Sequence, residues 1–335
     1  MVNRINFCLI IVLLFSSCDA WVIPEDPKTE PLDIFDSLWK DVKERYSFFE
    51  HKDIDWENIR TTYRAKITSD MGSVNLFDVL ASMLFELRDG HVNLSAGFDN
   101  SRNWEWYQDY PDNYDQNIID KNYLRRDFWI SGPLKHQFIN DVLYVNYRSF
   151  SQKIAESNLQ VVLERAKLGR GIIIDVRNNG GGSLGNAYTL ASAFTDSEVP
   201  VARKRIKNGI GMDDFSTWEE ITVPAGDNVY SGPVIVLTNR RSYSATTFFA
   251  QMMKELPQVT IVGDQTGGGG GIPVYGELIN GWTYRFSGTQ TIDMEGRQIE
   301  DGVLADVRVD LNPISTAKGE DNIITTALRI LMGNN

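Results

Sequence analysis

A series of strand-length apolar runs that alternate with helix-like segments constrains the fold more than any other feature of the sequence. The apolar runs cover residues 141–147, 171–176, 233–238 and 259–263, and the expected helices between them cover 152–168, 184–195 and 244–256. Strands that are apolar throughout are typical of a mostly parallel sheet with both faces covered by helices. The alternation therefore predicts an α/β core that occupies residues 141–335.

Upstream of this core, the pattern changes to apolar residues at helical spacing. About three helices are expected, which predicts a small N-terminal helical domain at 33–95. A connecting segment, 96–140, follows; its aromatic residues show no period and suit a loop packed on the body better than a platform for a ligand. Near the C-terminus, 281–296 predicts a β-hairpin and 316–332 a closing helix.

The first residues have the features of a secretion signal. An early Arg4 precedes an apolar run too short for a stable membrane span, and small residues then lead to Cys18. The order Phe15-Ser16-Ser17-Cys18 resembles a bacterial lipoprotein signal, with 1–18 as signal peptide, Cys18 as the lipidated residue and 19–32 as a linker. This interpretation implies a lipid-anchored protein of a bacterial cell envelope, on the periplasmic or outer-membrane face. Alternatively, cleavage occurs elsewhere and Cys18 is incidental.

Charge and cysteine content exclude several classes of function. The net charge of −12 disfavours a nucleic-acid partner, because phosphate binding needs a basic surface. Only two cysteines occur, Cys8 inside the apolar run and Cys18 at the expected cleavage site. The mature chain would therefore have no disulfide framework, thiol nucleophile or thiolate metal site.

Hydroxyl side chains cluster where the third apolar run ends and a helix is expected to begin. The stretch "TNRRSYSATTFFAQMMKE" places Ser242, Ser244 and Thr246 within five residues. Serine is a preferred residue at a helix N-terminus, so one serine could simply cap the helix. If one is instead a nucleophile, the chain must also supply a general base and an oxyanion hole.

The base can be sought by elimination, because the chain has only three histidines. His51 and His136 occupy charged or turn-like contexts and are predicted to be solvated surface residues. His91 follows an apolar helix face that ends at Asp89-Gly90, which is a suitable place to direct an imidazole into a cleft. The alternative is a histidine that caps the C-terminus of that helix.

A glycine-rich turn supplies candidate oxyanion donors. "IIIDVRNNGGGS" runs from a buried strand into Asn178-Asn179 and then Gly180 to Gly182, before a helix start. Glycines allow the backbone to approach a ligand closely, and a helix N-terminus favours negative charge. The spacing matches neither a Walker A loop nor a dinucleotide-binding motif, which disfavours a phosphate site.

These segments, in this order, resemble the serine peptidase family of C-terminal processing peptidases, the tricorn core and interphotoreceptor retinoid-binding protein. The resemblance is carried by five stretches of the sequence: "DVRNNGGG", "SYSATTFFAQMMK" with "VTIVGDQTGGG", "LRDGHVNL" and "IEDGVLADVRV". It implies a ClpP/crotonase-like core, with Ser244 rather than Ser242 as nucleophile. The processing branch uses a lysine base at the position of Gly269, so the chain is similar to the tricorn-like branch. This similarity implies His91 as base and Glu300 as the acid that orients it.

Departures from the family pattern leave some points open. "QIEDGV" has one residue fewer between Glu300 and the following glycine, so Asp301 or Asp89 could orient the base instead. Gly90 stands where the tricorn pattern has a serine. The segment between His91 and residue 141 is too short for a PDZ domain of roughly 80–100 residues.

The resemblance implies a serine peptidase that acts on a peptide or protein through an acyl-enzyme. The N–H groups of Gly181 (or Gly182) and Ala245 would hold the oxyanion, and no metal or organic cofactor is expected. Two alternatives remain. One is a non-catalytic lipoprotein that binds peptides or lipids on the same scaffold, and the other is an esterase.

Overall fold

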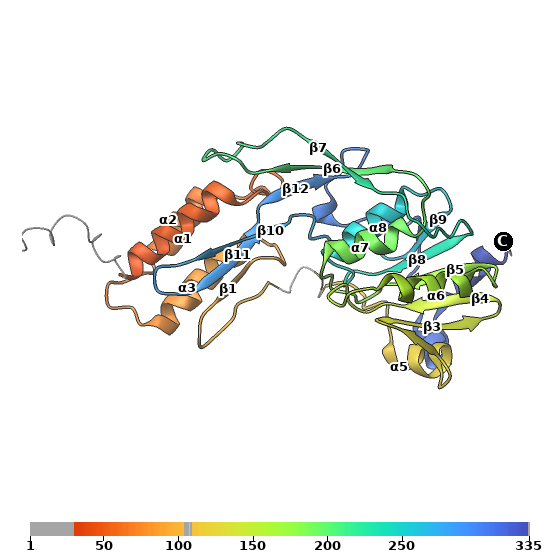
Figure 1. Ribbon diagram of the computed structural model, residues 1–335. Helices are drawn as coiled ribbons and strands as arrows, with labels where there is room; N and C mark the ends of the chain where they lie inside the picture. The colour runs from red at the N-terminus through yellow and green to blue at the C-terminus, as the bar shows by residue number, and fades with distance from the viewer. Residues whose placement is uncertain (1–29, 104–106, 108, 334–335) are drawn as a thin grey trace, which may run out of the picture.

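The computed structural model describes residues 30–333, except 104–106 and 108. The expected signal peptide, Cys18 and nearly all of the linker lie outside these residues. The protein has two parts, a helical lobe built around the N-terminal segment and a larger α/β core (Figure 1). Within the described part of the chain, no helix combines the length and the apolar character that a membrane span requires.

The core is a seven-stranded sheet in the order β13-β9-β8-β5-β4-β3-β2. Its strands are β2 (Trp129–Ser131), β3 (Leu134–Ile139), β4 (Val142–Asn146), β5 (Gly171–Asp175), β8 (Val234–Thr238), β9 (Val259–Gly263) and β13 (Val307–Arg308). β4, β5, β8, β9 and β13 run parallel, whereas β2 and β3 are antiparallel to their neighbours. The α/β core expected from the apolar runs is thus present.

Helices cover both faces of this sheet. One face is covered by α6 (Glu156–Ala166), α7 (Leu184–Ser192) and α8 (Ala245–Lys254), and the other by η1 (Ile119–Leu124) and α10 (Asn322–Leu331). Successive side chains of β5 point to opposite faces of the sheet. Ile172 and Ile174 belong to the hydrophobic cluster under α6, α7 and α8, and Ile173 belongs to the cluster under η1 and α10. Burial on both faces explains why these strands are apolar throughout.

Two boundaries of the core differ from expectation. The sheet begins at Trp129, inside the expected connecting segment, because β2 and β3 extend it beside β4. That segment also forms α5 (Gln116–Ile118) and η1, which are packed under the sheet. At the other end, α10 begins at Asn322 because Gly319 adopts φ 78° and Asp321 caps the helix; α9 (Pro313–Ala317) is separate.

The lobe combines segments from distant parts of the sequence. Its elements are α1 (Pro31–Arg45), α2 (Trp56–Arg64), α3 (Ser73–Phe85), β1 (Asn93–Ser95), β10 (Pro273–Glu277) and β11 (Thr283–Ser287). The three expected helices are present, and Trp39 and Trp56 each donate an indole N–H to the other's carbonyl. Phe286 of β11 is completely buried in a hydrophobic cluster that it shares with residues of the helices. β11 lies beside these helices (Figure 1).

The prediction of a β-hairpin over 281–296 is wrong. β11 pairs with β1 and β10, whereas β12 (Thr289–Ile292) pairs with β6 (Val199–Ile206) in a second sheet that also contains β7 (Glu219–Val223). Gly281, at φ 80°, makes the turn that joins β10 to β11, so the true hairpin lies earlier in the chain. β12 instead continues from the lobe toward the core, beneath β6 and β7 (Figure 1).

Candidate active site

Ser244 lies in a sharp turn between β8 and α8. Its backbone has φ 57° and ψ −121°, a conformation that costs about 1–3 kcal/mol for a residue with a side chain. It occupies the N-cap position of α8, yet its side chain makes no capping hydrogen bond. Ser242, in contrast, is fully buried and donates its hydroxyl to the Val176 carbonyl at 2.8 Å. Ser242 is therefore structural, and Ser244 has a hydroxyl available for other contacts.

The glycine turn after β5 lies directly against the Ser244 turn, since β5 and β8 are neighbours and parallel. Asn179 links the two turns: its carbonyl accepts from the Tyr243 N–H at 3.0 Å and its side chain accepts from Thr246 Oγ1 at 2.9 Å. A Cβ on Gly181 would lie 2.6 Å from the Tyr243 carbonyl oxygen. Only glycine permits this close approach.

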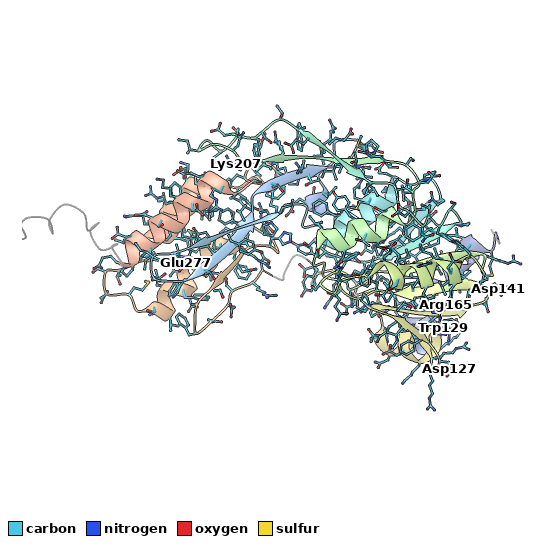
Figure 2. All side chains as sticks on the ribbon, viewed as in Figure 1. Asp127, Trp129, Asp141, Arg165, Lys207 and Glu277 are labelled. Carbon is cyan, nitrogen blue, oxygen red and sulfur yellow. The ribbon has the colours of Figure 1, made fainter. Side chains whose placement is uncertain are left out.

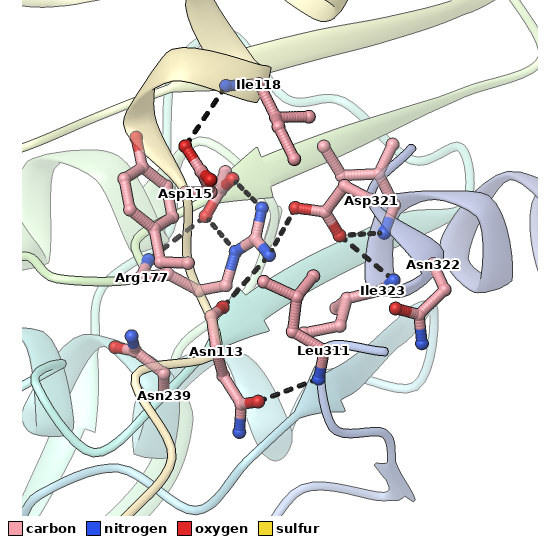
Figure 3. A network of polar contacts seen from close by, with 12 residues as sticks. Asn113, Asp115, Ile118, Arg177, Asn239, Leu311, Asp321, Asn322 and Ile323 are labelled. Atoms are coloured by element: carbon pink, nitrogen blue, oxygen red, sulfur yellow. Dashed lines mark hydrogen bonds and ion pairs between the residues drawn. The ribbon is translucent and has the colours of Figure 1, made fainter. Parts of the chain in front are cut away.

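A buried ion cluster holds the start of the glycine turn. Arg177 donates to both carboxylate oxygens of Asp175, at 2.9 and 2.6 Å, and to Asp321 at 2.8 Å. Figure 3 shows the guanidinium of Arg177 reaching Asp321 at the start of α10 and the carbonyl of Asn113. All three charged side chains are essentially inaccessible. Such pairing offsets the cost of burying the charges, and removing one partner would leave another unpaired.

His91 enters the site from the lobe. α3 ends at Phe85, and the following turn contains Arg88 at φ 47° and Asp89, whose carboxylate accepts from the His91 backbone N–H at 2.8 Å. The Tyr46 hydroxyl, from the segment after α1, holds the same turn through the Leu87 carbonyl. The turn directs the imidazole toward the core rather than back onto the end of the helix.

The two residues meet at the boundary of lobe and core. His91 Nε2 lies 3.0 Å from Ser244 Oγ, which is hydrogen-bonding distance for a nucleophile and a general base. The Tyr243 ring packs beside the imidazole, with 5.0 Å between ring centroids. His91 is only 5% exposed.

Burial lowers the pKa of His91 to about 4. The negative charge of Asp89 opposes this effect, whereas the positive charges of Arg285 and Lys52 add to it. A lowered pKa keeps the imidazole neutral at neutral pH, as a proton acceptor must be.

Glu300, in the 3₁₀ turn η2 (Ile299–Asp301), is not hydrogen-bonded to His91. Its carboxylate instead pairs with Lys52 Nζ at 2.8 Å, and both side chains are largely buried. Burial raises the pKa of Glu300 despite the positive charge of Lys52. The expected hydrogen bond between Glu300 and His91 is therefore not formed in this structure.

The backbone of Gly271 influences both groups. An interaction with this backbone raises the pKa of His91 and lowers the pKa of Glu300. Within the described part of the chain, His91 Nδ1 makes no well-formed hydrogen bond. Of the other acids considered, Asp301 lies 3.0 Å from His51, and Asp89 is the carboxylate whose charge most raises the pKa of His91.

The expected oxyanion donors differ in their present contacts. The Gly181 N–H donates to Asn179 Oδ1 at 3.0 Å, so it would have to exchange that bond to reach a ligand. Gly182 forms a parallel bridge with Phe150, in which the Gly181 carbonyl accepts from the Phe150 N–H and the Ser183 N–H donates to the Phe150 carbonyl. In this arrangement the N–H of Gly182 is directed away from Phe150. No hydrogen bond joins the N–H of Gly182 or Ala245 to another residue within the described ranges.

A cavity of about 610 Å³ opens over Ser244 and His91. It is lined by the glycine turn, by Tyr243, by Tyr107 and by residues of the lobe. Ser244, His91, Gly181 and Gly182 all border it. In this cavity and throughout the described chain, no group of three or more His, Cys, Asp and Glu residues is arranged to bind a metal ion.

The other two histidines lie away from the site, but His136 is not the surface residue that the sequence suggested. It is fully buried on β3, where its Nδ1 lies 3.2 Å from the Leu134 carbonyl oxygen and its ring contacts Arg165. The Arg165 guanidinium lies 4.4 Å from the centre of the Trp129 ring, and both residues are labelled in Figure 2. The sheet extension by β2 and β3, which was not foreseen, buries this histidine.

Sequence reasoning missed several residues of the site. Lys52 lies in a charged connection with no distinguishing pattern, so nothing marked it as the partner of Glu300. Arg285 carried a weak signal, because in "TYRFS" the buried Tyr284 and Phe286 place it on the opposite face of the strand. Asn179 was seen only as part of the glycine turn.

Comparison with known protein families and curated proteins places most of the chain in matched regions. A family model described as "Peptidase family S41" matches residues 141–309, which is half of the chain, and one described as "Tricorn protease C1 domain" matches residues 27–85. The chain is 25% identical over 174 residues to the carboxy-terminal processing protease CtpA of Bacillus subtilis; the match covers 51% of this chain and 36% of the relative. The chain thus spans about a third of the length of such curated relatives.

Solved structures give matches over nearly the whole described chain. A putative peptidase from Parabacteroides merdae is 40% identical, with a TM-score of 0.87, and the match covers 91% of this chain and 97% of that one. Mature CPAF, at 12% identity and a TM-score of 0.68 over 91% and 98% of the two chains, shares the fold. On the strength of the family model and of this 40% identity over most of both chains, the chain belongs to peptidase family S41.

Proposed function

We propose that the protein is a serine peptidase that hydrolyses peptide bonds through an acyl-enzyme formed on Ser244. The observation that carries the proposal is the 3.0 Å separation between Ser244 Oγ and a buried, neutral His91. The strained backbone of Ser244 supports it, since unusual conformations that persist are concentrated at functional sites. Membership of the S41 family supports the choice of a peptide as substrate.

The chemistry follows from the contacts. Ser244 Oγ attacks the substrate carbonyl carbon while His91 Nε2 accepts the hydroxyl proton. The Ala245 N–H, at the start of α8, and the Gly182 N–H are the donors for the resulting oxyanion, with Gly181 joining them if it releases Asn179. His91 then returns the proton to the leaving amine, and water hydrolyses the acyl-enzyme by the same steps in reverse.

The third member of the site is a cluster rather than a single acid. Asp89 stabilises the imidazolium that forms during the reaction, because its charge is the main influence that raises the pKa of His91. Glu300 belongs to the same cluster through Lys52, whose charge interacts with both carboxylates. In this proposal Glu300 is a positioning residue that acts through Lys52 and the Gly271 backbone.

Labelling with a fluorophosphonate probe tests the proposal directly, because the probe phosphonylates only an activated serine. We expect the wild-type protein to be labelled, and Ser244→Ala and His91→Ala to lose labelling while they remain folded. His51→Ala is the matched control, since His51 lies beside Asp301 away from Ser244, and it should label normally. A folded wild-type protein that does not label would contradict the proposal and favour a binding protein on the same scaffold.

Comparison of matched ester and amide substrates separates a peptidase from an esterase. A peptidase cleaves both, whereas hydrolysis of the ester alone would replace the proposed peptide-bond chemistry with ester hydrolysis on the same residues.

We also propose that Cys18 carries a lipid that anchors the protein in a bacterial cell envelope. The support is the sequence preceding Cys18, which lies outside the described residues. Metabolic labelling with an alkyne fatty acid should modify the wild-type protein but not Cys18→Ala. Equal labelling of both proteins would exclude lipidation at this residue.

A further inference from the structure

The charged residues that line the cleft in the described structure are opposite in sign to the net charge of the protein. The chain has a net charge of −12, yet the Asp, Glu, Lys and Arg residues that line the cavity at Ser244 in the described structure are all arginines: Arg102, Arg241 and Arg285. A concave site with charges of one sign concentrates ligands of the other sign. The ligand of this cleft should therefore be locally acidic.

Of the arginines that line this cavity, Arg285 has less charge compensation than Arg241. No ion pair or hydrogen bond joins its guanidinium to another residue of the described chain, and its Nε is buried. Arg241, in contrast, is paired with Asp112 at 3.1 Å and lies over the Tyr107 ring. Arg177, the buried arginine of the core, has two carboxylate partners.

The position of Arg285 is set by the lobe. Its neighbours on β11, Tyr284 and Phe286, are buried in the lobe, so alternation along the strand directs Arg285 to the other face, where it lines the cavity. Its positive charge lowers the pKa of His91, which shows that the two side chains interact electrostatically. A ligand group that contacts Arg285 would therefore lie near the reacting atoms.

A second cavity extends the cleft along the lobe. It measures about 600 Å³, follows β1, β10 and β11, and shares Arg102, Tyr275 and Arg285 with the first. Its acidic lining residue, Glu277, lies on β10 within the lobe (Figure 2). β10 and β1 are both edge strands, which can accept an extended peptide. Arg285 thus lies where the two cavities join, in the middle of a groove.

We infer that this groove selects peptides that carry a carboxylate close to the bond to be cleaved, with Arg285 as the specificity-determining residue and Arg102 and Arg241 beside it. The inference rests on the proposed function. An arginine offers a planar fork of donors that matches a carboxylate, and such pairs are strongest where water is largely excluded. The carboxylate is either an Asp or Glu side chain or the free C-terminus of the peptide.

Binding to the full-length Ser244→Ala protein tests the inference without hydrolysis. The probe is a random decapeptide library, prepared once with free C-termini and once amidated, and captured peptides are sequenced by mass spectrometry. We expect peptides with Asp or Glu to be enriched about tenfold or more over those with Asn or Gln, as a charge-assisted pair predicts. Ser244→Ala/Arg285→Gln should lose this preference, and Ser244→Ala/Arg285→Lys should retain part of it.

The matched control is Ser244→Ala/Arg329→Gln, which removes the same charge from α10, at a different cavity. Its preference should equal that of Ser244→Ala. Capture that requires a free C-terminus but is indifferent to Asp and Glu would assign the carboxylate to the peptide terminus. The inference is overturned if Arg285→Gln leaves acidic selection unchanged, if selection is indifferent to both kinds of carboxylate, or if no peptide is captured.

The outcomes also separate this inference from the proposed function. Acidic selection that depends on Arg285 in a protein whose Ser244 does not react with a fluorophosphonate would retain the groove and refute the peptidase. A reactive Ser244 with no acidic preference would do the reverse.

Discussion

The core and the lobe contribute opposite halves of the candidate site, and they stabilise those halves differently. On the core side, Arg177 is saturated by Asp175, Asp321 and the Asn113 carbonyl, and Asn179 ties the glycine turn to the Ser244 turn. Where the lobe meets the core, Lys52 and Asp89 of the lobe and Glu300 of η2 share one ion pair. Neither His91 Nδ1 nor Glu300 Oε2 makes a well-formed hydrogen bond within the described chain. The turn of the nucleophile is held by a fully paired network, whereas the base is held by hydrogen bonds to its backbone turn and by burial of its ring.

This difference indicates where the site can adjust. A saturated buried network has few alternative arrangements, whereas one with spare donors and acceptors can rearrange at low cost when a ligand arrives. The lobe also carries Arg285, which interacts electrostatically with His91. We therefore expect changes in the lobe to alter the base, and changes in the core to alter the nucleophile and the oxyanion donors.

The largest expected effect breaks the lobe itself. Phe286→Ala should lower the free energy of unfolding by about 3–5 kcal/mol, because the ring is fully buried between the helices and β11. Urea unfolding measures this loss, and fluorophosphonate labelling should fall with it as His91 loses its support. Tyr275→Ala, in the same hairpin but 69% exposed, should stay within about 0.5 kcal/mol of wild type. Equal effects of the two variants would show that β11 does not hold the lobe.

Removing the lysine of the lobe cluster should have the next largest effect. Lys52→Met leaves Glu300 buried without its partner, which should cost about 3 kcal/mol in urea unfolding. Adding Glu300→Gln should restore part of the loss, because the uncompensated carboxylate is then gone. Lys204→Met removes an exposed pair with Glu219 and should cost less than about 1 kcal/mol. If Lys52→Met proves as mild as Lys204→Met, the buried pair is not what stabilises this part of the lobe.

A change on the core side should lower the rate at which Ser244 is labelled by the fluorophosphonate probe. Gly181→Ala would place a methyl group 2.6 Å from the Tyr243 carbonyl oxygen at φ 93°, displacing the Ser244 turn. The rate of labelling should fall about 100-fold, as expected for a misplaced nucleophile. Gly180→Ala is the control, since a Cβ there meets no atom within 4 Å, and its loss should be much smaller. Similar losses in both variants would mean that the turn tolerates no side chain at all, whatever its direction.

The smallest expected effect is the pH dependence of labelling, which tests how strongly burial at the lobe acts on His91. Because burial lowers the pKa of His91 to about 4, the imidazole stays neutral, and labelling should remain above half its maximum, down to about pH 4. The same shift means that, as pH falls from 6.5 to 4, the unfolded chain gains a proton at His91 that the folded chain does not, so this group's contribution to stability declines. Labelling rates over pH 3.5–8 check the first statement. A half-maximum near pH 6.5 would show that the lobe does not desolvate the base.

The residues of the core were easier to predict than those of the lobe for a physical reason. β4, β5, β8 and β9 are buried on both faces, so each appears as an apolar run, and the turns after β5 and β8 carry the distinctive residues of a site. In the lobe, the strand β11 that completes the hydrophobic core lies almost 200 residues after α3. Local hydrophobic periodicity cannot show that two segments so far apart pack together. The prediction of a hairpin over 281–296 failed because β11 and β12 are both strands but do not pair with each other. β11 pairs with the preceding strand β10 and with the distant β1, whereas β12 pairs with the distant β6.

The sequence by itself determined an α/β core with a preceding set of helices, Ser244 at a strand-to-helix turn, the glycine turn beside it, and His91 as the candidate base, because local patterns and elimination suffice for these. Only the tertiary structure decided that Glu300 pairs with Lys52 rather than His91, that Gly181 is already bonded to Asn179, that His136 is buried, and that Arg285 lines the cleft. The bond from Gly181 to Asn179 is local and depends on the conformation of the glycine turn. The other three depend on contacts between segments far apart in the chain, and such contacts are set by packing and by the burial of charge, which no local pattern encodes.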